Sequence, residues 1–230
     1  MRSILPAAEE DLLSGIFSGP AFAAAIALIL NLNQSHRTHM KKMLLTLATL
    51  ACLLPAAPVS AQDALSTIFS RKSVRTYTEQ PVSEEQVETL LKAAMAAPSG
   101  MNAQPWRFVV VRSQETKKAL ASGFNKMIAQ APVVIVVCGK TTGRGGKENG
   151  NWTADCAAAT ENLLLAAEAI GLGAVWTACY PYEDRMKPTI ETLGLPKDVK
   201  PYCIVPVGYP GGKEKPKDKW KPENIHYEKW

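Results

Sequence analysis

The segment from Thr153 to Ile170 constrains the fold more than any other part of the sequence. It is rich in alanine and leucine, and Gly171 follows it directly, so it predicts a long helix that stops there. Apolar residues lie on most sides of this helix, which is typical of a helix buried at the centre of a domain. Other elements must therefore surround it, and an apolar content of 47% supplies the side chains for such a core.

Shorter periodic segments predict the surrounding elements. Ser83 and Gln86 form a capping box before an apolar helical face that ends at Pro98. The β-branched run from Val133 to Cys138 predicts a strand buried on both faces. The other predicted helices are 64–70, 115–130 with a break near Gly123, and 186–193; the other strands are 108–112, 174–177 and 203–207. This order predicts an α+β fold, a mixed sheet flanked by helices, followed by an extended arm.

A secretory signal peptide is predicted at residues 40–61. Lys41 and Lys42 form a basic start, an apolar run extends to Leu54, and a small-residue cleavage site precedes Gln62. Because such a signal belongs at an N-terminus, residues 1–39 are interpreted as an overcalled start or an N-terminal extension. Residues 62–230 are then the mature domain, exported and expected in the periplasm.

Other destinations stay open. The apolar run from Phe22 to Leu32 is an alternative membrane anchor, but it has about half the roughly 20 residues that a spanning helix needs. Cys52 is an alternative site for a lipid anchor, although the preceding Thr49-Leu50-Ala51 matches such a site poorly. A cytoplasmic location is the remaining alternative, and the mature domain itself contains no predicted membrane span.

Charge and cysteine content narrow the classes of partner. A formal charge of +5 is too mild to indicate nucleic acid, and much of the excess comes from lysines near the C-terminus. Cys138, Cys156, Cys179 and Cys203 lie in apolar segments, which favours buried free thiols over disulfides. Cysteine and histidine spacing does not indicate a metal site.

A basic turn is the first candidate binding site. Arg71, Lys72 and Arg75 surround Ser73, and three cations with a hydroxyl at a helix end can hold a phosphate. The alternative is a solvated basic turn. Lys217 and Lys219 lie among other exposed charges, so a solvated surface is their default interpretation.

The loop from Pro98 to Asn102 is the second candidate. Gly100 lets a ligand approach the backbone closely, and Asn102 and Gln104 each offer a donor and an acceptor, which suits a heterocycle with amide-like edges. The alternative is a plain connection from helix to strand, with Trp106 filling the core. The strand end at 177–178 is a third candidate, because its backbone amides could face a ligand.

The order of these motifs resembles the FMN-dependent nitroreductase family. The motifs are RKSVR, APSGMNAQPWRF, AAEAIGLGAVW, and PVGYP with a lysine-rich tail, and the resemblance covers Leu65 to Trp230. It implies an α+β fold and an entwined homodimer that holds FMN in each of two interface pockets. The tail with His226 and Trp230 looks like the compact branch of the family.

The resemblance also implies roles for individual residues. Near the FMN phosphate it places Arg71, Ser73, Lys217 and Lys219. Lys72 matches a position that borders the flavin, Arg75 the cation at its pyrimidine edge, and Thr177 and Ala178 the strand end near N5. Along the flavin, but from the partner subunit, it places Pro98, Ser99, Gly100, Met101 and Asn102. Gln104 is expected to brace that loop.

The implied chemistry belongs to the cofactor. In the family, flavin N5 takes a hydride from NAD(P)H and passes it to a nitroaromatic, quinone or similar acceptor in a ping-pong scheme, so no catalytic side chain is expected. Trp152 is a candidate for the acceptor side, with a core residue at the helix entry as the alternative. Because NAD(P)H is scarce outside the cytoplasm, an exported member would need another donor. The alternative function is a non-catalytic flavin-binding or flavin-carrier protein.

Overall fold

The computed structural model describes residues 64–121 and 125–230. The predicted signal peptide, the start at Met40 and the domain boundary at Gln62 therefore lie outside the described residues. Within the described residues, no helix is both long and apolar enough to cross a membrane.

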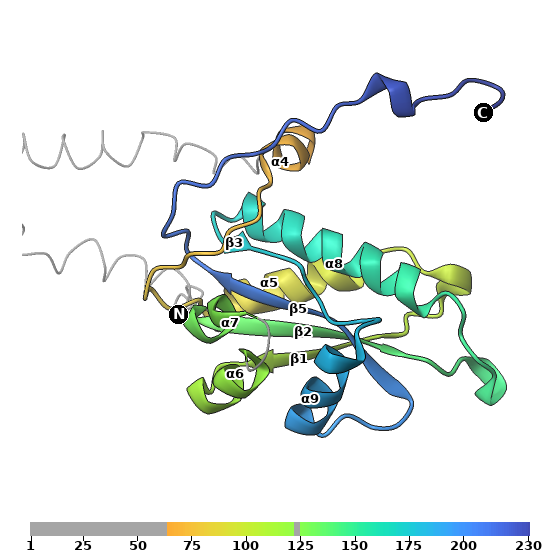
Figure 1. Cartoon of the computed structure of the whole chain (residues 1–230), viewed down its shortest axis with the longest axis horizontal. Helices are drawn as coiled ribbons and strands as arrows, with labels where there is room; N and C mark the ends of the chain where they lie inside the picture. Colours follow the sequence, from red (N-terminus) through yellow and green to blue (C-terminus); the bar gives the residue numbers. More distant parts are fainter. Residues whose placement is uncertain (1–63, 122–124) are drawn as a thin grey trace, which may run out of the picture. The chain divides into compact units, whose positions relative to one another are not determined.

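A sheet with five strands forms the middle layer of the domain (Figure 1). Its order is β1 (Trp106–Val111), β2 (Val133–Lys140), β5 (Val199–Gly208) and β3 (Gly173–Ala174), and β4 (Thr177–Ala178) also pairs with β5. These strands pair antiparallel, while an isolated bridge between Ser73 and Ala174 is parallel. Seven of the eight residues of β2 are buried, as its continuous apolar sequence predicts.

Helices cover both faces of the sheet (Figure 1). On one face, α5 (Glu84–Met95) and α8 (Trp152–Ala169) enclose a core with Leu90, Leu163 and Ile135. On the other, α6 (Gln114–Ala121), α7 (Lys126–Gln130) and α9 (Glu183–Leu193) pack around a second core. The prediction of a central apolar helix at 153–170 is confirmed, because eight residues of α8 are buried.

Short sequence motifs set the ends of most of these helices and strands. The capping box of Ser83 and Gln86 is present at the start of α5. The helix predicted at 115–130 is two helices, α6 and α7, as the predicted break required. The first strand was predicted two residues late, since β1 already begins at Trp106 and buries its indole. The four cysteines are free and buried, which confirms their interpretation as core thiols.

The strand predicted at 174–177 was wrong in detail, because the structure divides it into β3 and β4. Ala174 pairs with Val207 and Thr177 pairs with Ile204, so Val175 lies opposite Pro206. Proline has no amide hydrogen to donate, and the ladder is interrupted at this point.

The chain after β5 leaves the body of the domain as an arm (Figure 1). Apart from the short 3-10 helix η3 (Pro222–Asn224), residues 211–230 have no regular structure, as predicted. Its aromatic side chains Trp220, Tyr227 and Trp230 are exposed. Exposed aromatic residues in such a number are unusual for a segment that packs only on its own chain.

Candidate functional site

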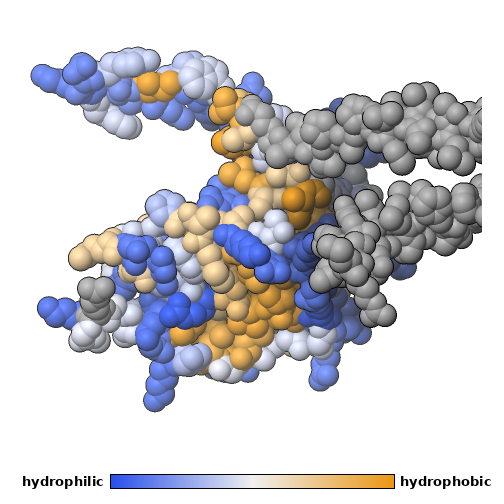
Figure 2. Space-filling model, turned by 180° about the vertical axis from the view of Figure 1, so that it is seen from behind, coloured by the Kyte–Doolittle hydropathy of each residue, from blue (hydrophilic) through white to orange (hydrophobic). Residues whose placement is uncertain are grey.

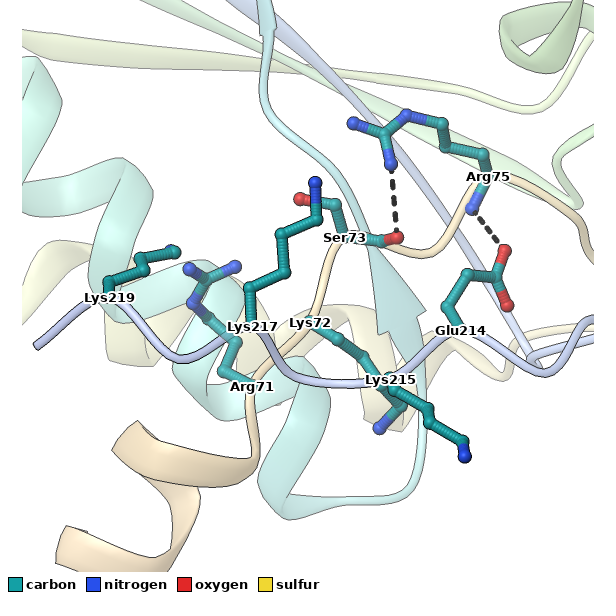
Figure 3. A pocket seen from close by; sticks show the side chains of 8 residues that line it. All are labelled: Arg71, Lys72, Ser73, Arg75, Glu214, Lys215, Lys217 and Lys219. Carbon is teal, nitrogen blue, oxygen red and sulfur yellow. Dashed lines mark hydrogen bonds between the residues drawn. The ribbon is translucent and has the colours of Figure 1, made fainter.

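The basic turn and the lysine-rich arm meet in one cavity, here called the cationic cradle. The turn follows α4 (Ala64–Ser70) and is held by the backbone bond from Val74 N to Ala174 O, 3.1 Å. The arm returns beside it, since Gly211 N donates to Thr76 O at 2.8 Å. The cavity has a volume of about 400 Å³ and is lined by Arg71, Lys72, Ser73, Arg75, Glu214, Lys215, Lys217 and Lys219 (Figure 3).

Two cations of the cradle are already paired with helix α8. Arg71 Nε lies 3.2 Å from Glu161 Oε1, and Lys72 Nζ lies 2.8 Å from Glu168 Oε1. The ion pairs found among the described residues use none of the other four cations. The pairs fix the turn against α8, and the remaining positive charge is free to attract an anion. The structure therefore brings together two sequence motifs whose default interpretation was a solvated surface.

Glu214 is a member of the cradle that the sequence did not single out. Its Oε1 accepts a hydrogen bond from Arg75 N at 3.1 Å (Figure 3). Backbone N–H donors, with that of Arg75 first, lower the pKa of Glu214 below its ordinary value. Lys215 also lines the cavity and was not predicted. A glutamate and a lysine in a charged tail give no local signal, so only the fold could reveal them.

The loop from Pro98 to Asn102 lies at the opposite end of α8. It contains the short 3-10 helix η1 (Gly100–Asn102), and Gly100 N donates to Asp155 Oδ1 at 2.8 Å, in the first turn of α8. Gln104 Nε2 donates to Asn102 Oδ1 at 2.9 Å, so Gln104 braces the loop as expected. The side chain of Met101 is fully exposed.

The same loop stores backbone strain. Met101, Asn102 and Gln104 have φ angles of 53°, 54° and 47°, in the left-handed region that non-glycine residues rarely occupy. Each such residue costs on the order of 1 kcal/mol or more, and residues of this kind cluster at ligand-binding sites. A plain connection between helix and strand would not require three of them.

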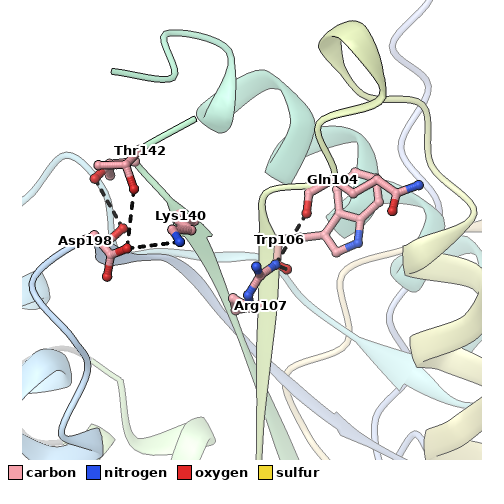
Figure 4. A network of polar contacts seen from close by, with 7 residues as sticks. Gln104, Trp106, Arg107, Lys140, Thr142 and Asp198 are labelled. Carbon is pink, nitrogen blue, oxygen red and sulfur yellow. Dashed lines mark hydrogen bonds and ion pairs between the residues drawn. The ribbon is translucent and has the colours of Figure 1, made fainter. Parts of the chain in front are cut away.

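A second cavity adjoins this loop. Its volume is about 560 Å³, and its walls include Gly100–Pro105, Arg107, Lys140 and the loop 142–149. Arg107 Nη1 donates to the carbonyls of Gln104 and Trp106, and Lys140 pairs with Asp198 at 3.4 Å (Figure 4). Arg107 and Lys140 were not predicted, because each is an ordinary basic residue on a strand.

In the sequence, the strand end at 177–178 lies between the loop 98–102 and the arm residues of the cradle. Thr177 is buried, and its Oγ1 has no hydrogen-bond partner among the described residues. Buried hydroxyls normally have a partner, so this one is available to hydrogen-bond a bound ligand. Ala178 O accepts from Arg185 Nη1 at 3.0 Å.

Trp152 is buried in the part of the chain that the structure describes. Only 7% of its surface is exposed, and its ring packs edge-on against Tyr180 at a centroid distance of 4.8 Å. A Cβ atom at Gly139 would lie 2.3 Å from the indole, which shows how closely the strand approaches it. These contacts favour the alternative of a core residue at the helix entry, and the acceptor-side role of Trp152 stays a proposal.

The two predicted groups are far apart within one chain. Asp155, which holds the loop, and Glu168, which holds Lys72, are thirteen positions apart on α8. At 1.5 Å per residue this is about 20 Å. A single chain therefore does not bring the loop to the cradle.

An apolar groove opens between α4, α5 and α8. Its walls include Ile68, Ala93, Leu165 and Ala166, and the adjacent Phe69 is exposed. Figure 2 shows hydrophobic surface exposed on one face of the domain. Apolar surface of this kind is typical of a protein–protein interface.

Comparisons with known proteins identify the family. The Nitroreductase family model matches residues 68–126 and 121–209. A relative from Archaeoglobus fulgidus, named for NADH dehydrogenase/NAD(P)H nitroreductase, is 41% identical over 74% of this chain and 99% of its own. The FMN reductase [NAD(P)H] of Bacillus subtilis is 27% identical over 72% of this chain and 73% of its own.

Solved structures agree with this assignment. A crystal structure from Bacteroides thetaiotaomicron, named in the same way as the archaeal relative, has a TM-score of 0.69 and 46% identity, and covers 73% of this chain and 98% of its own. An FMN-dependent nitroreductase from Clostridium difficile has a TM-score of 0.67 and 25% identity, covering 72% and 99%. The chain belongs to the nitroreductase family, and its fold is the fold of that family.

Proposed function

We propose that this protein is an FMN-dependent oxidoreductase that acts as a homodimer. The observation that carries the proposal is the separation of a cationic cradle and an amide-bearing loop at opposite ends of α8. Each region suits one part of FMN: the cradle suits a phosphate, and the loop suits a planar heterocycle. Two chains packed with their α8 helices antiparallel would bring the loop of one to the cradle of the other.

The cradle fits the phosphate of FMN. Ser73 offers a hydroxyl, and Lys217 and Lys219 offer ammonium groups that are outside the ion pairs of the described residues. Arg71 keeps its guanidinium next to the cavity while its Nε binds Glu161. Lysine at 219 supplies a point charge and not the two-pronged contact that arginine would make.

The ring of the cofactor would lie between residues of two subunits. Arg75 and Lys72 would border it on the cradle side, with Thr177 and Ala178 at its reactive edge. The partner subunit would contribute the loop 98–102. The unpartnered Thr177 Oγ1 and the strained loop support this arrangement, since both are features that a ligand would explain.

When bound, FMN would supply the redox chemistry, accepting a hydride from NAD(P)H or another donor and reducing a nitroaromatic, quinone or similar acceptor in ping-pong order. The residues of the chain bind and orient. The second cavity, beside the loop, is a candidate space for the donor and the acceptor. No side chain of this chain is required as an acid or a base.

Dimer formation has its own support. The apolar groove on α4, α5 and α8 and the exposed aromatic residues of the arm are surfaces that a second copy would cover. Binding of FMN and assembly of the dimer should then be coupled. A monomer that binds FMN stoichiometrically would contradict this part of the proposal.

A non-catalytic flavin carrier is the alternative, and one titration separates the two. Purified protein should be yellow, and anaerobic addition of NADH or NADPH should bleach its visible absorbance, which an added nitroaromatic should then restore. Bound flavin that neither nicotinamide reduces, but that dithionite does, would favour the carrier. Protein that binds no FMN would exclude both.

A further inference from the structure

Glu214 occupies an unusual place for a carboxylate, because it lies in the cavity that six basic side chains line. It comes from the arm, and it bonds Arg75 N, 139 positions earlier in the chain. A carboxylate in a phosphate site repels the phosphate, so its presence there indicates a structural role. The contacts of Glu214 identify that role.

The carboxylate is enclosed by the turn that begins the arm. Its Oε2 is shielded from solvent and has no hydrogen-bond partner among the described residues. A Cβ atom at Gly212 would lie 2.5 Å from Oε2, and a Cβ atom at Gly211 would lie 3.0 Å from the backbone of Tyr77. The two glycines therefore let the arm fold tightly over Glu214 and against the basic turn.

The bond from Arg75 to Glu214 is also the last attachment of the arm. Pro210 forms a bridge with Tyr77, and Gly211 bonds Thr76. Among the hydrogen bonds found between described residues, those that join the arm beyond Gly211 to the body of the domain go to the Glu214 carboxylate, from Arg75 N at 3.1 Å and from the backbone of Thr76. Lys217 and Lys219 follow within five residues, a length that spans up to about 17 Å when extended.

We propose that Glu214 is a positioning residue: it fastens the arm to the basic turn and thereby holds Lys217 and Lys219 over the anion site. This inference rests on the proposed function for the identity of the anion as the FMN phosphate. The fastening itself is a property of the chain without flavin. Two roles of Glu214 predict opposite results when its carboxylate is removed. If it only repels the phosphate, its removal would strengthen phosphate binding. If it fastens the arm, its removal would weaken phosphate binding.

The test compares Glu214→Ala and Glu214→Gln with Glu223→Ala and Glu223→Gln, which change the same charge farther along the arm, at an exposed residue. In the flavin-free protein, amide hydrogen exchange at Arg75 and along 213–219 should be about 10-fold faster in Glu214→Ala. The glutamine variant keeps an acceptor and should lie between wild type and alanine. The Glu223 variants should match wild type.

Flavin affinity gives the second measurement. Glu214→Ala should weaken FMN by about 10-fold and riboflavin by less than about 2-fold, since riboflavin lacks the phosphate. Unchanged exchange at Arg75, or FMN binding that is unchanged or tighter, would overturn the inference. If wild type binds no FMN, the proposed function fails, and the exchange measurement alone decides whether Glu214 fastens the arm.

Discussion

The two ends of helix α8 are built in different ways. In its C-terminal half, Glu161 and Glu168 hold two cations of the cradle by ion pairs, and the site depends on charge. At its N-terminal end, Asp155 holds a strained loop by one bond to Gly100 N, and the site depends on backbone shape and amide groups. A phosphate requires charge and a planar ring requires shape, so each end suits one part of the same ligand. Under the proposed function, one complete site therefore requires a pair of chains.

The buried core between α8 and the sheet serves as the closed reference for both ends, and it gives the largest expected effect. Burial raises the pKa of Cys138 and of Cys156 to about 12, and it raises the pKa of Cys203 further. At pH 8 the thiolate fraction of Cys138 and Cys156 should be about a thousand-fold below that of a free cysteine.

Labelling with iodoacetamide should therefore leave Cys138, Cys156 and Cys203 unmodified in native protein and modify them in denaturant. Peptide mass spectrometry reads each site separately. Rapid native labelling of Cys156 would mean that the buried face of α8 is open to solvent, and the contrast with the two sites at its ends would be lost.

Near each end of α8, one glycine of the sheet leaves no room for a larger residue. A Cβ atom at Gly139 would lie 2.3 Å from Trp152, and one at Gly173 would lie 2.6 Å from the buried, stiff Val74. Replacement of either glycine by alanine should cost about 1–3 kcal/mol of unfolding free energy. Chemical denaturation measures this cost.

Gly143→Ala is the matched control, because its nearest contacts would be 3.7 Å away. Gly173→Ala should also weaken the binding of FMN, because it displaces Val74 and with it the basic turn. Gly139→Ala should instead displace Trp152 at the N-terminal end of α8. An unfolding free energy equal to that of wild type in both variants would show that the packing around the two glycines is looser than these distances indicate.

Removal of a phosphate contact should weaken the binding of FMN and not that of riboflavin, which distinguishes the cradle from the loop. Arg71→Ala should weaken FMN by about 1–3 kcal/mol and leave riboflavin nearly unchanged, because the proposed ligand contact of the guanidinium is with the phosphate. Lys92→Ala is a suitable control, since Lys92 forms an exposed pair with Glu88 outside the cradle. Fluorescence titration of apo-protein gives both affinities, and equal losses for both ligands would show that Arg71 acts through its pair with Glu161.

Replacement of Arg75 should give the smallest of these effects, a shift in the midpoint potential of the bound flavin. A cation beside the pyrimidine edge stabilises a reduced flavin that carries negative charge, so Arg75→Gln should bind FMN with a lower midpoint potential and slower hydride uptake. A net loss of about 1.4 kcal/mol corresponds to roughly 30 mV for two electrons. Glu214 in the same cavity partly offsets this cation. Spectroelectrochemistry on flavin-saturated protein checks the shift, and an unchanged potential would remove Arg75 from the flavin edge.

Strong local patterns made much of the fold predictable. The apolar sequence of α8, the capping box at Ser83 and the β-branched run of β2 each specify one element, and the order of motifs specified the family. The split of β3 from β4 was not predicted, because it depends on Pro206 in a distant strand.

The candidate site was predictable only in part, for a similar reason. Arg71 and Ser73 form a local cluster, and the loop at Gly100 has a distinctive composition. Glu214 has meaning only through its bond to Arg75, and the burial of Trp152 could not be predicted because it depends on Gly139 and Tyr180, which lie far from it in the sequence.

A heterodimer tests the central claim most directly. One subunit would carry Arg71→Ala with Lys217→Ala in the cradle, and the other would carry Asn102→Asp in the loop, each with a different affinity tag. Homodimers of either kind should bind FMN poorly. The doubly purified heterodimer contains one undamaged site if each site takes its cradle from one subunit and its loop from the other, so it should bind about one FMN per dimer with near wild-type affinity. A heterodimer that binds no more FMN than the two homodimers would show that each chain builds its site alone, and it would contradict the account.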